Sequence, residues 1–171
     1  MTTATTTEPR PAVGLRVLVG GIGYRYLRDL SVGGWVTDRL MERAGGDVEV
    51  EDLSYHPVGL HQNLTDREPY DRAVIISAPR RGRPPGTITT YRWDGVLPSV
   101  EQIQDRVSEA VTGVIELDNT LIVCGAFGSL PADVRVVEVE PEDEGWGEGF
   151  SDTVSAVLED VLETVWSFTR R

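Results

Sequence analysis

Residues 15–23 read Leu-Arg-Val-Leu-Val-Gly-Gly-Ile-Gly, and they are the clearest structural signal in the chain. The short run Leu15–Val19 predicts a buried strand, and the glycines after it predict a tight turn. An amphipathic helix is expected next, with Ser31 as its N-cap and an end at Gly45-Gly46. The apolar residues of this helix recur at helical spacing: Val32, Trp35, Val36, Leu40 and Met41.

The same alternation of strands and helices continues along the chain. Further strands are expected at Val48–Leu53, Ala73–Ala78, Thr87–Trp93 and Val134–Val139, and helices at Pro57–Leu64, Val100–Val111 and Val154–Phe168. The apolar run Leu121–Ala126 is too short to be assigned to either type from its period. The fold class predicted is α/β, as a three-layer α/β/α domain with a mostly parallel central sheet of about five strands.

Length and composition predict a single domain. The chain has 171 residues, of which 40% are hydrophobic and 26% charged, within the range of ordinary globular proteins. Residues 1–13 are expected to form a flexible tail, because they are rich in Thr and Pro, and residues 14–171 to form the domain. The apolar runs are too short for a membrane span, and no secretory signal pattern opens the chain. A cytoplasmic location without membrane association is therefore expected.

The charge balance bears on partners. The chain carries 16 Lys and Arg against 28 Asp and Glu, a formal charge of −12, so its average surface repels phosphate and no nucleic-acid partner is expected. One local basic cluster exists at Arg80, Arg81 and Arg83, among prolines and glycines. The segment is interpreted as a solvated surface loop, with docking of an acidic peptide or partner as the alternative.

Motifs for nucleotide binding and nucleophilic catalysis are incomplete. The turn Gly20–Gly23 resembles a dinucleotide-binding turn, but Tyr26 stands where its third glycine is needed, and Asp52 lies about ten residues too far along. Ser77 ends a predicted strand without a G-x-S-x-G elbow around it. Cys124 is the only cysteine, which excludes an intrachain disulfide, and its apolar surroundings favour a packing role.

The two histidines, His56 and His61, are five residues apart, whereas two ligands on one helix face need a spacing of four. A turn could still direct both rings toward one ion, together with Asp52 or Asp29. The alternative is a pair of surface histidines in a loop.

Three landmarks in order carry a resemblance to a known family. They are Arg16–Gly23 followed by Arg28–Gly33, then Ala73–Ala78 followed by Pro85-Gly86-Thr87, then Phe127–Pro131 followed by Val134–Glu142 and a terminal helix. From Leu15 to Phe168 the chain resembles the hydrogenase maturation proteases, endopeptidases that remove the C-terminal extension of the nickel-iron hydrogenase large subunit. The resemblance implies a helix at Val114–Phe127 and places Asp52–Leu64 in a loop that lines the cleft.

The chain departs from this family where the family recognises nickel. The resemblance implies three ligands (an acidic residue, an aspartate and a histidine), and the matching positions hold Leu30, Ser77 and Gly113. Leucine and glycine offer no donor side chain, and a neutral serine hydroxyl is a poor ligand for nickel. A shift of one residue recovers Asp29 in place of Leu30, but no shift recovers the other two. Tyr24 also replaces the family's usual asparagine.

These departures leave three hypotheses for function. The first is a degenerate, non-catalytic binding or assembly factor in nickel-iron hydrogenase maturation, without a cofactor, whose protein partner is a hydrogenase large subunit or its C-terminal peptide. The second is an active endopeptidase on that large subunit, with nickel bound by substitute ligands in the cleft. The third is a nucleotide-binding α/β module, so whether the chain is an enzyme stays open. The candidate cleft residues for substitute ligands are Asp29, His56, His61, Glu116 and Asp118.

Overall fold

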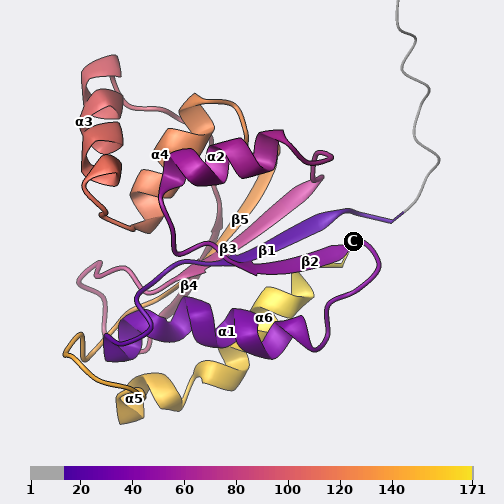
Figure 1. Cartoon of the computed structure of the whole chain (residues 1–171). Helices are drawn as coiled ribbons and strands as arrows, with labels where there is room; N and C mark the ends of the chain where they lie inside the picture. The colour runs from indigo at the N-terminus through magenta and orange to yellow at the C-terminus, as the bar shows by residue number, and fades with distance from the viewer. Residues whose placement is uncertain (1–13, 171) are drawn as a thin grey trace, which may run out of the picture.

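The computed structural model describes residues 14–170, which form one five-stranded sheet with helices on both faces (Figure 1). The strand order is β2-β1-β3-β5-β4, and β4 is antiparallel to β5 while the other neighbours are parallel. The strands are β1 (Val17–Gly21), β2 (Val48–Asp52), β3 (Arg72–Ser77), β4 (Ile88–Arg92) and β5 (Asp133–Val139). The predicted α/β fold with a mostly parallel sheet of five strands is confirmed. The tail expected at residues 1–13 lies outside the described residues.

The helices form the two outer layers (Figure 1). One layer contains α1 (Val32–Met41), preceded by a 3-10 turn, η1 (Arg28–Ser31), together with α5 (Asp152–Ser155) and α6 (Leu158–Ser167). The opposite layer contains α2 (Pro57–Thr65), α3 (Val100–Val111) and α4 (Leu117–Ala126). The ambiguous run Leu121–Ala126 is therefore helical, as the family resemblance implies.

Alternation along the central strands produces two cores. Successive side chains of a strand point to opposite faces of a sheet, so a strand between two helical layers must be apolar throughout. In β3, Val74 and Ile76 pack with the α1 and α6 side chains, whereas Ala73 and Ile75 pack with those of α2 and α4. The fully apolar strands of the sequence are thus the central strands of the sheet.

Glycines bring α1 directly against the end of β1. A Cβ at Gly21 would lie 2.1 Å from the Gly33 carbonyl oxygen, and a Cβ at Gly33 would lie 2.6 Å from the Ile22 nitrogen. The loop after β1 and η1 also separate the glycine turn from the start of α1. These glycines therefore permit close packing of the chain with itself.

Two details differ from the sequence-based expectations. The expected helix over Val154–Phe168 is divided into α5 and α6 by a tighter turn, in which the Val157 N–H donates to the Val154 carbonyl. The Ser31 hydroxyl does not cap α1, because it donates to the Arg28 carbonyl at 2.6 Å. Across residues 14–170, no helix combines the length and the apolar character needed to cross a membrane.

Candidate functional site

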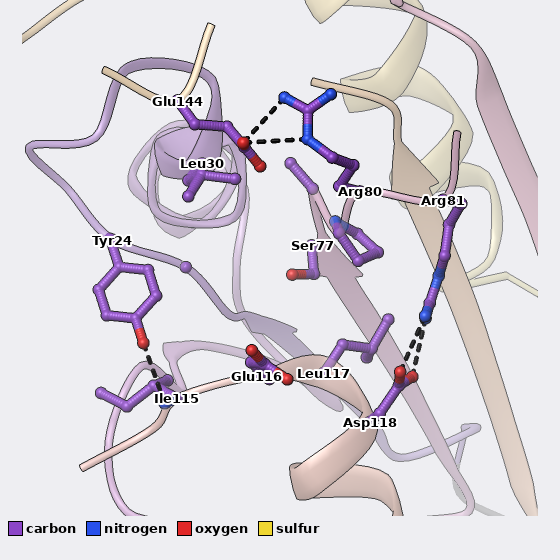
Figure 2. A pocket seen from close by; sticks show the side chains of 13 residues that line it. Tyr24, Leu30, Ser77, Arg80, Arg81, Ile115, Glu116, Leu117, Asp118 and Glu144 are labelled. Atoms are coloured by element: carbon purple, nitrogen blue, oxygen red, sulfur yellow. Dashed lines mark hydrogen bonds and ion pairs between the residues drawn. The ribbon is translucent and has the colours of Figure 1, made fainter. Parts of the chain in front are cut away.

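A pocket of about 260 Å³ opens at the carboxyl ends of β1 and β3, where open α/β sheets commonly bind ligands. Four segments surround it: the loop after β1, the end of β3 with the loop that follows, the residues at the start of α4, and Glu144 (Figure 2). The lining residues are Gly23, Tyr24, Leu30, Ser77, Ala78, Pro79, Arg80, Arg81, Ile115, Glu116, Leu117, Asp118 and Glu144.

The structure places two of the three family ligand positions at this pocket. Leu30 reaches it from η1, and Ser77 reaches it from the last position of β3 with only 6% of its surface exposed. Gly113 does not line the pocket and lies in the turn after α3, with a φ of +94°. These positions supply one neutral hydroxyl between them, so they do not fit a nickel ion.

The start of α4 contributes the acidic side of the pocket. Glu116 is the N-cap residue of α4, its side chain makes no capping hydrogen bond, and Figure 2 shows its carboxylate beside the pocket. The Asp118 carboxylate instead accepts two hydrogen bonds from Arg81, at 2.7 and 2.8 Å. The Arg81 hydrogen bonds hold the pKa of Asp118 below its usual value despite partial burial. The Asp118 carboxylate is therefore already paired with an arginine of the same chain.

A buried carboxylate anchors the arginine loop, the segment 79–86 between β3 and β4 that carries Arg80, Arg81 and Arg83. Glu138, on β5, is only 1% exposed and accepts hydrogen bonds from Arg81 (2.9 Å), Arg83 (2.6 Å) and the Tyr91 hydroxyl (3.0 Å). Burial alone would raise the pKa of Glu138, but these hydrogen bonds lower it below the usual value. Burial of the Tyr91 hydroxyl, together with the nearby charge of Glu138, raises the pKa of Tyr91.

Further contacts fix the backbone of the arginine loop. The Glu140 carboxylate, also 1% exposed, accepts hydrogen bonds from the Arg81 and Gly82 backbone N–H groups at 3.0–3.1 Å. At the pocket edge, Arg80 forms an ion pair with Glu144 at 2.8 Å (Figure 2). The segment is an exposed loop, as predicted, and its arginines pair with carboxylates of the same chain.

Asp29 belongs to a different network from the pocket. It is fully buried, and its carboxylate accepts hydrogen bonds at 2.8–2.9 Å from the backbone N–H groups of Glu142, Asp143 and Ser151 and from the Ser151 hydroxyl. Burial alone would raise the pKa of Asp29, but these four donors lower it. The expectation that Asp29 is an available cleft ligand is wrong, since its oxygens hold the loop between β5 and α5.

The two histidines also lie away from the pocket. The His56 Nδ1 caps α2 by accepting from the Val58 N–H at 3.1 Å, and the His61 ring packs on the Phe127 ring with 4.8 Å between their centroids. No residue of the expected cleft loop 52–64 lines the pocket, because this segment forms the end of β2 and helix α2. The five candidate residues therefore do not converge, and only Glu116 and Asp118 reach the pocket.

A metal centre is not formed elsewhere in the described part of the chain. Within residues 14–170, no three His, Cys, Asp or Glu side chains come together in a group that could hold a metal ion. Cys124 is fully buried in the core between α2 and α4, where its Sγ lies 3.5 Å from the Pro57 carbonyl oxygen. Burial raises the pKa of the Cys124 thiol to about 11, so it is a packing residue.

Comparison with solved structures identifies the fold. The chain superposes on the hydrogenase maturating endopeptidase HybD from Escherichia coli with a TM-score of 0.67 and 24% identity, covering 90% of this chain and 91% of HybD. An endopeptidase from Escherichia coli solved in solution gives a TM-score of 0.66 and 26% identity, over 89% of this chain and 90% of the other. A hydrogenase 2 maturation peptidase from Thaumarchaeota archaeon SCGC_AB-539-E09 gives a TM-score of 0.63 and 22% identity, covering 90% of this chain and 97% of the peptidase. No protein-family model and no curated protein sequence matches the chain.

Proposed function

We propose that this protein, which has the fold of the hydrogenase maturation endopeptidases, binds a nickel-iron hydrogenase large subunit or its C-terminal peptide and does not cleave it. The observation that carries the proposal is the composition of the pocket. Leu30 and Ser77 occupy it at positions where the family resemblance implies metal ligands, and the neighbouring Asp118 is paired with Arg81. The fold of a maturation protease is retained, but the donors for its metal are not.

The pocket retains features that suit binding of a peptide. Tyr24, Leu30 and Ile115 offer apolar contacts, while the Ser77 hydroxyl can donate to or accept from a peptide group. Glu116 has no ion-pair partner among the described residues, so it gives the pocket one uncompensated negative charge. An extended segment that places a positive charge opposite Glu116 would complement this pocket.

Binding to the pocket is testable with a charge reversal. We expect Glu116→Arg to weaken binding of a large-subunit precursor that carries its C-terminal extension by about tenfold, which corresponds to about 1.4 kcal/mol. Glu101→Arg, a matched reversal of an exposed glutamate on α3, is expected to leave binding unchanged. Biolayer interferometry with immobilised precursor measures both. If the wild-type protein does not bind the precursor, or if both variants bind equally, the proposal fails.

Restoring the missing donors is expected to create a metal site. The triple variant Leu30→Glu, Ser77→Asp and Gly113→His should bind nickel in a calorimetric titration, whereas the wild-type protein should give no heat. The Gly113 substitution is the most demanding, because Gly113 lies outside the pocket lining and its φ of +94° is strained for a side chain, so folding of the variant is checked by circular dichroism. A folded triple variant that binds no nickel would show that these positions do not correspond to the family ligands.

A further inference from the structure

Two exposed aromatic rings lie beside each other on the loops that form one side of the pocket. Trp146 is 81% exposed and Tyr26 is 57% exposed, and their rings stack with 6.4 Å between centroids and 29° between planes. Tyr26 follows the pocket residue Tyr24 by two positions, and Trp146 follows the pocket residue Glu144 by two. We call Tyr26 and Trp146 the aromatic platform.

The backbone beneath the aromatic platform is held in place. The Gly147 N–H donates to the Tyr26 carbonyl at 2.8 Å, and the Arg28 N–H donates to the Gly147 carbonyl at 3.2 Å. Buried Asp29 fixes the same two loops through its four hydrogen bonds. An exposed tryptophan on a fixed backbone loses only its side-chain freedom when it is covered, and tryptophan is enriched among the residues that dominate protein interfaces.

The Trp146 loop of the aromatic platform is acidic, whereas the Tyr26 loop carries two arginines, Arg25 and Arg28, that are both paired with aspartates. Residues 141–149 contain four acidic and no basic side chains. Two of them are paired within the chain, Asp143 with Arg28 and Glu144 with Arg80. Glu142 and Glu148 are exposed, and neither takes part in an ion pair among residues 14–170. An exposed indole ring on a loop with two exposed, unpaired carboxylates is suited to a cation, which the ring attracts through its face and the carboxylates attract through their charge.

We propose that the aromatic platform docks a basic segment of the protein partner, with an arginine or lysine side chain over the Trp146 ring and with Glu142 and Glu148 on the same loop contributing attraction through their charge. The inference rests on the proposed function for the identity of the partner, and it adds the chemistry by which that partner is recognised. Nucleic-acid bases and anionic lipids also bind exposed aromatic rings, but their phosphates would be repelled by the loop carboxylates and by a net charge of −12.

A titration followed by NMR tests the inference at the ring itself. The side-chain indole N–H signal of Trp146, assigned by its loss in Trp146→Phe, is followed as a short arginine-containing peptide is added to the whole chain. We expect a saturable shift of this signal, and a much smaller shift with a peptide in which glutamine replaces each arginine. Trp146→Ala should weaken binding of the arginine peptide about tenfold, as should Glu142→Gln combined with Glu148→Gln.

The control variant and the remaining outcomes separate this inference from the proposed function. Glu101→Gln combined with Glu159→Gln removes two exposed charges from α3 and α6, and it should leave binding unchanged. Equal shifts with both peptides, or a preference for an oligonucleotide or for phosphatidylserine vesicles, would overturn the inference. If Trp146→Ala binds the large-subunit precursor as well as the wild type, the inference fails while the proposed function stands. If the precursor does not bind but the arginine peptide does, only the proposed function fails.

Discussion

Replacing Asp29 with alanine is expected to lower the free energy of unfolding by about 3 kcal/mol, the upper part of the range for single substitutions. The substitution removes a fully buried acceptor and leaves three backbone N–H groups and one hydroxyl without their partner. Urea unfolding measures the change. Asp105→Ala, which removes an exposed aspartate on α3, should change the free energy by less than about 0.5 kcal/mol.

Substitution of Asp29 should also have local and pH-dependent effects. Hydrogen exchange should accelerate mainly at residues 142–151, because Asp29 holds that loop. The pKa of Asp29 is lowered in the folded state, so its contribution to stability is complete above its unfolded pKa of about 3.9 and is lost as the pH falls through the folded value. The stability difference between the wild type and Asp29→Asn should therefore shrink below about pH 4. A difference independent of pH, or unchanged exchange in the loop, would contradict the assigned role.

Glu138→Ala is expected to destabilise the protein by about 3 kcal/mol, because it removes the shared partner of two arginines and a tyrosine beneath the pocket. Loss of one member of a buried ionic network usually costs more than the network contributes to stability as a whole. Thermal and urea unfolding measure the effect. Glu163→Ala breaks the exposed pair with Arg43, and it should cost no more than about 1 kcal/mol.

A double-mutant cycle with Arg83 separates the network from the loss of volume at Glu138. If the two side chains interact as the structure shows, Glu138→Ala combined with Arg83→Ala should be less destabilising than the sum of the two single substitutions. Additive effects would show that Arg83 does not depend on Glu138. In that case the arginine loop would be held mainly by the Glu140 carboxylate.

Much of the fold could be predicted because its signals are local. Strands β1 and β3 are apolar on both faces, so their short hydrophobic runs stand out, and the apolar stripe of Val100–Val111 predicts α3. The interruption between α5 and α6 leaves the apolar spacing almost unchanged, so no pattern in the sequence indicates it. The Leu121–Ala126 run needed the family resemblance, since its buried residues lie on more than one side of the helix.

The site was less predictable because its contacts join distant residues. Arg81 and Glu138 are separated by 57 positions, and nothing near either residue indicates the pair. A signal for Glu138 did exist: it interrupts the apolar residues at the end of a predicted strand, and a charge in that place requires a partner. Its position next to Leu30 predicts that Asp29 is a cleft residue, yet the two neighbours on η1 have different surroundings. The exposure of Trp146 followed only from the structure.

The mass of a hydrogenase large subunit incubated with the protein tests most directly whether the subunit is bound without being cleaved. A nickel-loaded precursor with its C-terminal extension is incubated with the protein, the complex is isolated by gel filtration, and the intact mass of the precursor is measured. We predict co-elution with the precursor mass unchanged. A precursor shortened by its C-terminal extension would contradict the account and show that the protein is an active endopeptidase.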